Sequence, residues 1–275
     1  MSADTGWVEN PPRRTKRFFD VHELVNYREL IGFLAMRDLT VHYKQAAYGL
    51  IWAIAQPMAT AMVITVLFGR FAGFPSDGIP YFAYAFLGFT VWTYFTSSLS
   101  AVTQSLVSNA GLVTKIYFPR LVAPLAAVLP GLVDMAVAFG AVAVVMVVLG
   151  ITPGPALFTL PLWIAALCLA VLGLGLIFAT LSVLYRDALY PYGLLVQLLF
   201  VGSPLLYPSS LIKGGWSYPY HLNPMVAVLD GFHWSVLGGR PPGLPAIVSL
   251  LSGLLFLAAG LRYFTATERR FADVI

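Results

Sequence analysis

The chain has 275 residues, of which 59% belong to the hydrophobic set AVILMFWYC and 10% are charged, with a net charge of +4 at pH 7. Soluble domains carry roughly 25% charged residues, so this composition cannot build a water-facing surface and indicates an integral membrane protein. The single cysteine, Cys168, excludes a disulfide within the chain and argues against a metal site built on thiolates.

The N-terminal segment, residues 1–47, has no apolar run of spanning length, and no ordinary secretory signal peptide is visible in it. Residues 22–46 place apolar side chains at helical spacing with charged residues between them: Leu24, Tyr27, Ile31 and Leu34. This pattern predicts one or two short amphipathic helices on the cytoplasmic membrane surface, with a solvated tail as the alternative. The candidate residues of this interfacial helix are Arg37, Asp38, Tyr43 and Lys44.

The predicted transmembrane domain covers residues 48–265. A helix needs about 20 apolar residues to cross the hydrocarbon core, and six segments meet that length: about 49–69, 82–106, 122–149, 160–184, 188–206 and 244–264. The second segment ends in a portion rich in Ser, Thr and Gln, which suits contact with protein or water better than contact with lipid. The sequence therefore predicts an all-α protein with six transmembrane helices and a C-terminal tail at residues 266–275.

The distribution of Lys and Arg orients this arrangement, because basic residues are enriched in cytoplasmic loops. The side that holds both termini receives 13 of the 16 basic residues: Arg13, Arg14, Lys16, Arg17, Arg28, Arg37, Lys44, Lys115, Arg120, Arg186, Arg262, Arg269 and Arg270. The other side receives Arg70, Lys213 and Arg240. We therefore expect a multi-pass protein of the cytoplasmic (inner) membrane with both termini in the cytoplasm.

The segment between the fifth and sixth predicted spans, residues 207–243, is rich in proline, glycine and aromatic residues. Part of it reads NPMVAVLDGFHWSVLGG, which is apolar enough to enter the membrane but shorter than a span. Irregular backbone is tolerated at membrane depth only where it is buried in protein or lined by water. We therefore expect an outer re-entrant helical hairpin in this segment.

The sequence shows no motif that indicates nucleotide binding, catalysis or metal binding by this chain. No lysine follows a glycine, so the phosphate-binding motif G-x-x-x-x-G-K-[ST] does not occur. H-E-x-x-H and G-x-S-x-G are also absent, and the four histidines show no metal-ligand spacing. His221 and His233 both fall on the outer side, with Asp230 close to His233. We expect ordinary interfacial polar residues there, with a functional site as the alternative. We expect no catalytic residue, metal or cofactor in this chain.

Asp134 is the only acid well inside a predicted span. A charged side chain at the bilayer centre costs roughly 2.5–3.5 kcal/mol on translocon scales, so Asp134 should face protein or a cavity and have a partner. Two interpretations stand side by side, a gating or pathway residue and an interhelical hydrogen bond. A single acid also argues against ion-driven transport, which usually needs a relay of such groups.

Aromatic residues mark two of the predicted spans. Tyr48 and Trp52 are four residues apart at the start of the first span, and Tyr192, Phe200 and Tyr207 lie along one face of the fifth. Aromatic residues at span ends usually form interfacial belts. A protein-facing aromatic stripe is instead what a sugar-conducting path would use, because flat apolar faces stack on pyranose rings. These five residues are the candidate substrate path.

Several short blocks occur in the order and spacing of one family. The blocks are LTVHYKQAAYGLIWAIAQPM (39–58), VTKIYFPRLVAP (113–124), LYRDALYPYGLLVQLLFVGSPLLYP (184–208) and LNPM (222–225). In these blocks the chain resembles the ABC-2-type export permeases, and among them those that export lipid-linked polysaccharides such as O-antigen, teichoic acid or cell-wall galactan. One departure is Leu121, since the family often has an acid after its Phe-Pro-Arg.

The resemblance implies a permease subunit without its own ATPase site. Two copies would form a homodimeric pore, and two copies of a separate ATP-binding cassette subunit would dock from the cytoplasm and bind ATP and Mg. The family's first and fifth spans line the path, which corresponds to the five aromatic residues named above. The implied function is ATP-driven export of a lipid-linked glycan across the cytoplasmic membrane of a bacterium, with membrane lipids around the protein and no nucleic-acid partner.

The loop between the second and third spans carries the expected contact with the ATPase subunit. Its two basic residues mark it as cytoplasmic, the residue before the proline is held extended, and the proline can open the next helix. The two aromatic side chains are then expected to be apolar knobs that contact the ATPase subunit. The alternative is a short connecting loop without such a contact. The candidate coupling residues are Lys115, Tyr117, Phe118, Pro119 and Arg120.

Three other classes of protein fit parts of this pattern. An ABC-2 permease for drugs or small lipids has the same architecture, and a narrow path poor in aromatic residues would favour it. A secondary transporter would need ion-coupling groups beyond Asp134. A membrane-embedded enzyme acting on lipid-linked sugars would need paired acids or histidines facing one cavity, and the sequence pattern indicates no such pair.

Overall fold

The computed structural model describes residues 21–44, 49–111, 118–268 and 271, and these residues contain helices and no β-strand. The all-α prediction is therefore confirmed for the described part of the chain. The longer helices are α1 (Val21–Asn26), α2 (Arg28–Lys44), α3 (Gly49–Ile64), η1 (Thr65–Phe71), α4 (Tyr81–Ser108), α6 (Val122–Leu149), η2 (Pro155–Thr159), α7 (Leu160–Leu184), α8 (Leu189–Val201), α10 (Pro224–Leu237) and α11 (Ala246–Thr267). The one-turn helices are η3 (Arg186–Ala188), η4 (Ser209–Leu211), η5 (Gly214–Trp216) and α9 (Ser217–Tyr220).

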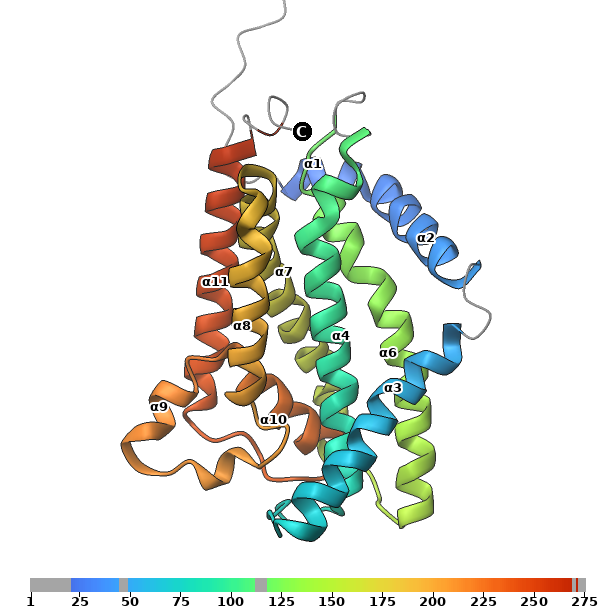
Figure 1. Ribbon diagram of the computed structural model, residues 1–275, viewed down its shortest axis with the longest axis vertical. Helices are drawn as coiled ribbons and strands as arrows, with labels where there is room; N and C mark the ends of the chain where they lie inside the picture. The colour runs from blue at the N-terminus through green and yellow to red at the C-terminus, as the bar shows by residue number, and fades with distance from the viewer. Residues whose placement is uncertain (1–20, 45–48, 112–117, 269–270, 272–275) are drawn as a thin grey trace, which may run out of the picture.

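Helix α4 lies in the middle of the bundle and contacts α3, α6, α7 and α10 (Figure 1). Helix α11 packs along α7, and α2 packs against α6. Figure 1 shows α1, the start of α6 and the C-terminal end of α11 at one end of the bundle, called here the α1 end. Helix α9, η1 and the end of α6 lie at the opposite end, called here the α9 end.

Among the described residues, four helices are long and apolar enough to cross a membrane: Ile51–Phe71, Val122–Leu149, Pro155–Leu184 and Ala246–Thr267. They occupy the first, third, fourth and sixth predicted spans. Helix α4 occupies the second predicted span but carries Ser, Thr and Gln in its second half, and α8 occupies the fifth with an apolar length of 13 residues. The chain is therefore a multi-pass membrane protein, while six spans stay a prediction.

The ends of several helices follow from local sequence. Gly150 ends α6 and Gly238 ends α10 in the left-handed conformation, with φ values of 67° and 70°, which glycine adopts without a steric penalty. Asn223 caps α10, because its side-chain oxygen accepts a hydrogen bond from the Met225 amide at 2.9 Å. Pro224 follows at the first helical position, where a missing amide proton is tolerated.

Glycine allows α7 and α11 to approach closely. A Cβ atom at Gly260 would lie 2.5 Å from the carbonyl oxygen of Gly173, and one at Gly173 would lie 2.7 Å from the backbone nitrogen of Leu257. Small residues at helix contacts let backbones pack tightly, which is a main source of helix association in membranes. The contact joins the two helices into a rigid pair that extends between both ends of the bundle.

The apolar interior falls into two clusters. The larger one is built around α4 and includes Phe86, Phe95 and Leu99, with contributions from α6, α7 and α10. The smaller one lies at the α1 end and joins α2, α4, α6, α7 and α11. The two ends of the bundle are therefore held by separate groups of side chains.

Two segments outside the predicted spans also fold into helices. The N-terminal pattern forms two helices, α1 and α2, as predicted, and α2 slopes along α6 toward the start of α3 (Figure 1). Residues 207–243 form three one-turn helices followed by α10, whose side chains are almost all buried against α4, α7 and α11. The entry of α10 into the membrane as part of a re-entrant hairpin stays a prediction.

Candidate functional site

Phe118 is buried, with 5% of its surface exposed. It belongs to the cluster at the α1 end together with Leu34 of α2, Leu106 of α4 and Phe264 of α11. Full burial of a phenylalanine side chain stabilises a fold by about 1.5–3 kcal/mol. The expectation that Phe118 is an exposed knob offered to a partner is therefore wrong, because the chain's own helices take up its ring.

Arg120 joins the start of α6 to the end of α11. Its Nη1 donates a hydrogen bond to the carbonyl oxygen of Glu268, and its guanidinium lies 5.7 Å from the centre of the Phe271 ring. The last carbonyls of a helix lack partners within the helix, so Arg120 satisfies one of them. Pro119 beside it is half-buried. Arg120 therefore ties the start of α6 to the end of α11 at the point where the sequence predicts the coupling loop.

Three of the candidate residues lie outside the described part of the chain. They are Lys115 and Tyr117 of the coupling loop and Tyr48 of the substrate path. Their assignments stay predictions.

The middle of α2 is tied to the end of α4 by side-chain hydrogen bonds. Arg37 donates through Nε and Nη2 to Oδ1 of Asp38, at 2.9 and 2.7 Å, and Nη2 also lies 2.7 Å from Oδ1 of Asn109. Asn109 follows directly after the last residue of α4, and its amide donates to the Ser105 carbonyl at 2.8 Å. Asn109 has no role in the sequence analysis, because nothing in its local pattern indicates a partner 72 residues away.

The C-terminal end of α2 reaches Asp134 in the middle of α6. The Tyr43 hydroxyl donates a hydrogen bond to Oδ1 of Asp134, and Nε2 of His42 lies 3.9 Å from Oδ2. Burial and the contact with Asp134 raise the pKa of Tyr43 to about 12, so its phenol stays protonated and remains a donor at neutral pH. Asp134 thus has a partner, which favours the interhelical hydrogen bond over the gating interpretation. Lys44, at the end of α2, is exposed.

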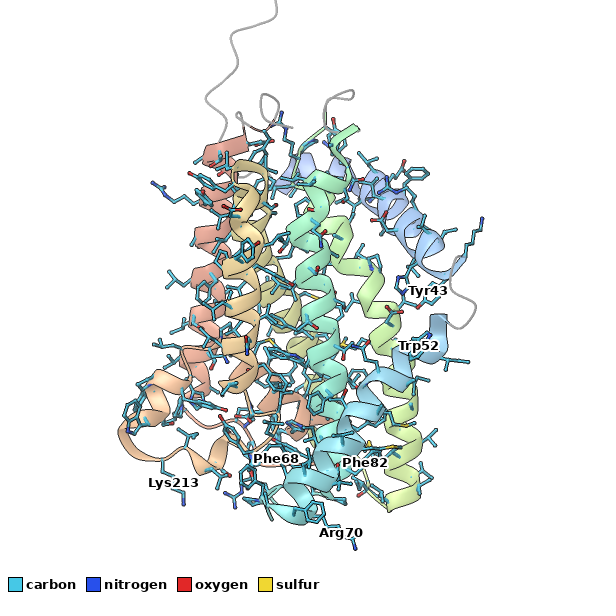
Figure 2. All side chains as sticks on the ribbon, in the orientation of Figure 1. Tyr43, Trp52, Phe68, Arg70, Phe82 and Lys213 are labelled. Carbon is cyan, nitrogen blue, oxygen red and sulfur yellow. The ribbon has the colours of Figure 1, made fainter. Side chains whose placement is uncertain are left out.

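The described residues of the candidate substrate path lie on different parts of the bundle. Trp52 of α3 is 64% exposed, and Figure 2 shows it near Tyr43, about halfway along the bundle. Tyr192 of α8 packs edge-on against Phe178 of α7, with ring centres 5.6 Å apart. Within the described part of a single chain, α3 and α8 do not pack extensively against each other, so helix packing does not join these residues into one surface.

Two further path residues are partly exposed and contact other aromatic rings. The Phe200 ring lies 5.6 Å from Trp92 and 6.2 Å from Phe89, both on α4. Tyr207 donates a hydrogen bond to the Val201 carbonyl at 3.0 Å and lies 6.5 Å from the Tyr220 ring. The aromatic stripe of the fifth predicted span therefore ends in a group of protein-facing rings near the α9 end.

The backbone that follows α8 is held by side chains from α4 and from the start of α10. The Tyr84 hydroxyl lies 2.7 Å from the Pro204 carbonyl and 3.1 Å from the Tyr207 carbonyl, to which it donates. Tyr81 donates to the Leu206 carbonyl at 2.6 Å. Asn223 donates to the Gly202 carbonyl at 2.8 Å.

Proline explains why these donors are needed. Proline interrupts a helix, and a buried carbonyl without a partner is costly. The run from Gly202 to Pro208, which contains two prolines, is the signal in the sequence that could have indicated the need for these donors.

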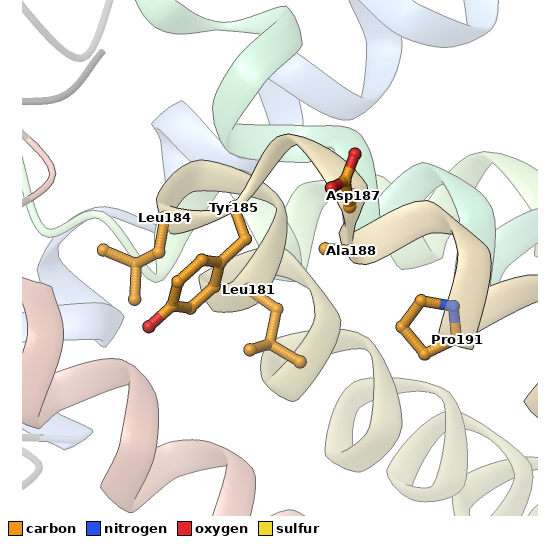
Figure 3. Close-up of a pocket in the computed structure, with 6 residues that line it drawn as sticks. All are labelled: Leu181, Leu184, Tyr185, Asp187, Ala188 and Pro191. Atoms are coloured by element: carbon orange, nitrogen blue, oxygen red, sulfur yellow. The ribbon is translucent and has the colours of Figure 1, made fainter.

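A cavity of about 470 Å³ lies at the turn between α7 and α8 (Figure 3). Aliphatic side chains and a proline line it, together with one carboxylate and one phenol: Leu181, Leu184, Tyr185, Asp187, Ala188 and Pro191. Tyr185 is 61% exposed, and Asp187 is also exposed. The cavity is an open apolar hollow with a polar rim.

A second cavity, of about 260 Å³, lies at the α9 end. Two acids, Asp77 and Asp230, and two histidines, His221 and His233, are among its lining residues. The expectation that no paired acids or histidines face one cavity is therefore wrong. The sequence missed the pairing because Asp77 stands in a short turn, 153 positions before Asp230, where it resembles an ordinary turn residue.

An all-helical bundle with four spanning helices and polar contacts buried between helices defines a multi-pass membrane protein. A family model described as ABC-2 type transporter matches residues 29–237, which is most of the chain. The chain belongs to the ABC-2 type transporter family.

Three known proteins that are similar to this chain share one name. Two proteins of Klebsiella pneumoniae called O-antigen export system permease protein RfbA are each 26% identical over 248 residues, covering 90% of this chain and 95% of the relative. A protein of the same name from Myxococcus xanthus is 26% identical over 258 residues, covering 93% of this chain and 98% of the relative.

Proposed function

We propose that this chain is the permease subunit of an ABC exporter that carries a lipid-linked polysaccharide across the cytoplasmic membrane of a bacterium. The observation that carries the proposal is the similarity to O-antigen export permeases over 90% or more of the chain. The chain lacks a P-loop lysine, so ATP and Mg would be bound by a separate ATP-binding cassette subunit.

The proposed topology has six spans, with α4 and α8 as the second and fifth, and both termini in the cytoplasm. The α1 end is then cytoplasmic and the α9 end is outer. The Lys and Arg distribution supports this orientation, since Figure 2 shows Arg70 and Lys213, two of the three basic residues assigned to the outer side, at the α9 end. In this topology α2 is the interfacial helix and α10 is the re-entrant helix.

The proposed assembly is a homodimer whose path is lined by α3 and α8. Both helices expose large apolar side chains, among them Ile51 and Trp52 on α3 and Leu194 and Leu198 on α8. Because one chain alone does not bring these two helices together, a second copy is needed to complete an aromatic path. Lipid would cover the faces that the second copy leaves free.

Coupling to the ATPase subunit is proposed at the α1 end. Two copies of that subunit would dock there, and Phe118 and Arg120 would act by positioning the loop of residues 112–117 rather than by touching the partner. Shifting a pore from 1:99 to 99:1 in favour of the open state requires about 5.5 kcal/mol of differential binding, which ATP-driven closure of the partner would supply. Helix α2 would pass the movement on, because it is bonded to both Asn109 and Asp134.

Deletion of the gene in its native bacterium tests the function. We expect the lipid-linked glycan to accumulate inside the cell and to return to the surface when the wild-type chain is supplied, but only while the ATPase subunit carries an intact P-loop lysine. Normal surface glycan in the deletion strain would refute the proposal. New sensitivity to drugs without a glycan defect would instead identify a permease for drugs or small lipids, and rescue without an active ATPase would identify a secondary transporter.

Coupling is tested in the same strain and in the purified complex. Arg120→Gln removes both the bond to Glu268 and the contact with Phe271, so we expect ATP hydrolysis to continue while export falls at least tenfold, with unchanged membrane insertion. Arg70→Gln, at the α9 end and outside the second cavity, is the matched control and should leave the ratio of export to hydrolysis unchanged. Unchanged export in Arg120→Gln would overturn the coupling assignment.

A further inference from the structure

The cavity at the α9 end is assembled from four separate parts of the chain. They are the stretch from Asp77 to Tyr84, the stretch from Pro208 to His221, helix α10 and the segment before α11. Arg240 and Gly243 at its edge are exposed, whereas His221 and His233 in its wall are buried. The cavity thus has an open rim and a closed polar interior.

One wall of the cavity is held by Asp77. Ser210 donates a hydrogen bond from its hydroxyl to Oδ1 of Asp77 at 2.9 Å, and Nε of Arg240 lies 3.8 Å from the same oxygen. Asp230 lies across from Ser209, with which it shares a side-chain hydrogen bond. Two carboxylates, two hydroxyls and one guanidinium therefore face one small space.

The opposite wall is held by His233, which is 5% exposed. Its ring stacks on Tyr84, with centres 4.0 Å apart and planes 8° from parallel, so its orientation is set by packing. Nε2 lies 3.0 Å from the Tyr84 carbonyl oxygen, which can only accept, so Nε2 carries the proton. Nδ1 is then an acceptor, and it has no hydrogen-bond partner among the described residues. A buried acceptor normally has a partner, and in a cavity with an open rim that partner is a water molecule or a donor group of a ligand.

The mixture of groups indicates the kind of ligand. The carboxylates and Nδ1 accept hydrogen bonds, and the exposed Arg240 guanidinium donates them, while the Ser210 hydroxyl, whose proton goes to Asp77, can accept. This mixture suits a molecule that carries both donors and acceptors. The two carboxylates disfavour an anionic ligand, because like charges repel. The described residues hold no group of three His, Cys, Asp or Glu side chains placed to bind a metal ion. A neutral polyol is the class that satisfies all of these groups.

The size of the cavity limits the size of the ligand. Its volume of about 260 Å³ lies just below the roughly 300–1,000 Å³ of pockets that hold drug-sized ligands. One sugar ring therefore fits, and an oligosaccharide does not. We propose that this cavity binds one neutral hexopyranose ring, as an outer subsite for a monosaccharide of the exported glycan. The role in export rests on the proposed function and on the proposed orientation, whereas the binding of a sugar ring does not.

Binding is tested with the purified full-length chain in lipid nanodiscs by saturation-transfer difference NMR. The probes are the methyl glycosides of glucose, galactose, mannose and rhamnose, each titrated through the millimolar range. We expect at least one glycoside to bind the wild type, and we expect Asp230→Asn to weaken its affinity at least tenfold, because the amide cannot accept hydrogen bonds on both of its terminal atoms. Ser210→Ala removes the hydroxyl that orients Asp77 in the cavity wall and should weaken binding threefold or more.

The matched control is Asp187→Asn, the same exchange in the cavity of Figure 3 at the α7–α8 turn, which should leave sugar affinity unchanged. The proposal is overturned if no glycoside binds the folded wild type, or if Asp230→Asn and Ser210→Ala bind as the wild type does. It is also overturned if Ca²⁺ or inorganic phosphate binds there in place of the sugars. Sugar binding in a chain whose deletion leaves glycan export intact would refute the proposed function and keep the cavity assignment.

Discussion

The two ends of the bundle are held together by different kinds of interaction. At the α1 end, side chains of five helices pack into an apolar cluster around Phe118 and Phe264, and Arg120 caps the end of α11. At the α9 end, tyrosine and asparagine side chains donate hydrogen bonds to the irregular backbone that follows α8. Apolar packing is non-directional, whereas hydrogen bonds weaken steeply with angle.

This difference indicates which end can move. Helices that pack through an apolar cluster can shift slightly against each other without losing all of their contacts. The segment from Gly202 to Pro208 has less freedom to shift, because three of its carbonyls accept hydrogen bonds from side chains of α4 and of the start of α10. We therefore expect the α1 end to adjust when a partner pushes on it, and the α9 end to hold its shape until its hydrogen bonds break together.

The largest expected effect on stability is at the contact between α7 and α11, the helix pair that extends between both ends of the bundle. Gly260→Val places a side chain against the Gly173 backbone, which has no rotamer that could relieve the clash. Overpacking typically costs about 1–3 kcal/mol and sometimes more, and we expect about 3 kcal/mol or more here. Thermal unfolding of the purified protein in detergent measures the loss.

Gly140→Val is the control for this change, since a Cβ atom at Gly140 of α6 meets nothing within 4 Å. Its unfolding temperature should stay close to that of the wild type. Equal unfolding temperatures for the two variants would show that α7 and α11 do not form the rigid frame.

A smaller effect is expected at the α9 end. Tyr84→Phe keeps the buried ring but removes the donor to the Pro204 and Tyr207 carbonyls. Leaving a buried acceptor unsatisfied costs about 1–3 kcal/mol, and the loss should be concentrated in the backbone after α8. Hydrogen exchange of residues 202–208 should rise in the variant while exchange at the α1 end stays unchanged.

Tyr190→Phe makes the same exchange at a side chain that is 80% exposed. It should alter neither stability nor exchange. A rise in exchange at both ends of Tyr84→Phe would break the distinction between a fixed end and an adjustable end.

The contact between α2 and α6 is expected to be weaker still. Hydrogen bonds between helices in membranes contribute about 0.6 kcal/mol on average and at most about 1.7 kcal/mol. A double-mutant cycle of Tyr43→Phe and Asp134→Ala, followed by the free energy of unfolding, should give a coupling within this range. A coupling of zero would mean that α2 is not bonded to α6 in the membrane, and that Asp134 has another partner.

The smallest effect on stability is expected for Arg37→Gln. Arg37 and Asp38 have more than a third of their side-chain surface exposed, and exposed ion pairs contribute about 0–1 kcal/mol. In the complex with the ATPase subunit, the same change should still lower export per ATP hydrolysed, because it frees α2 from Asn109. Lys44→Gln, on the same helix, should change neither quantity. Wild-type export per ATP in Arg37→Gln would remove α2 from the coupling route.

Sequence alone predicted the elements well where the signal is local. Apolar runs of about 20 residues predicted the positions of α6, α7 and α11, because length and hydropathy decide which helices can lie in lipid. The end of α8 was less predictable. The predicted fifth span runs to about residue 206, whereas the helix ends at Val201, since Pro204 interrupts it and side chains from other helices stabilise the unwound part.

The sequence by itself determined the membrane class, the positions of the main helices and the family resemblance, because each depends on composition or on short blocks of residues. Only the tertiary structure decided that Phe118 is buried, that Asp134 is bonded to Tyr43 91 residues away, and that Asp77 and Asp230 line one cavity. Hydropathy says that a residue needs apolar surroundings or a polar partner. Which neighbour meets that need is decided by how the helices pack.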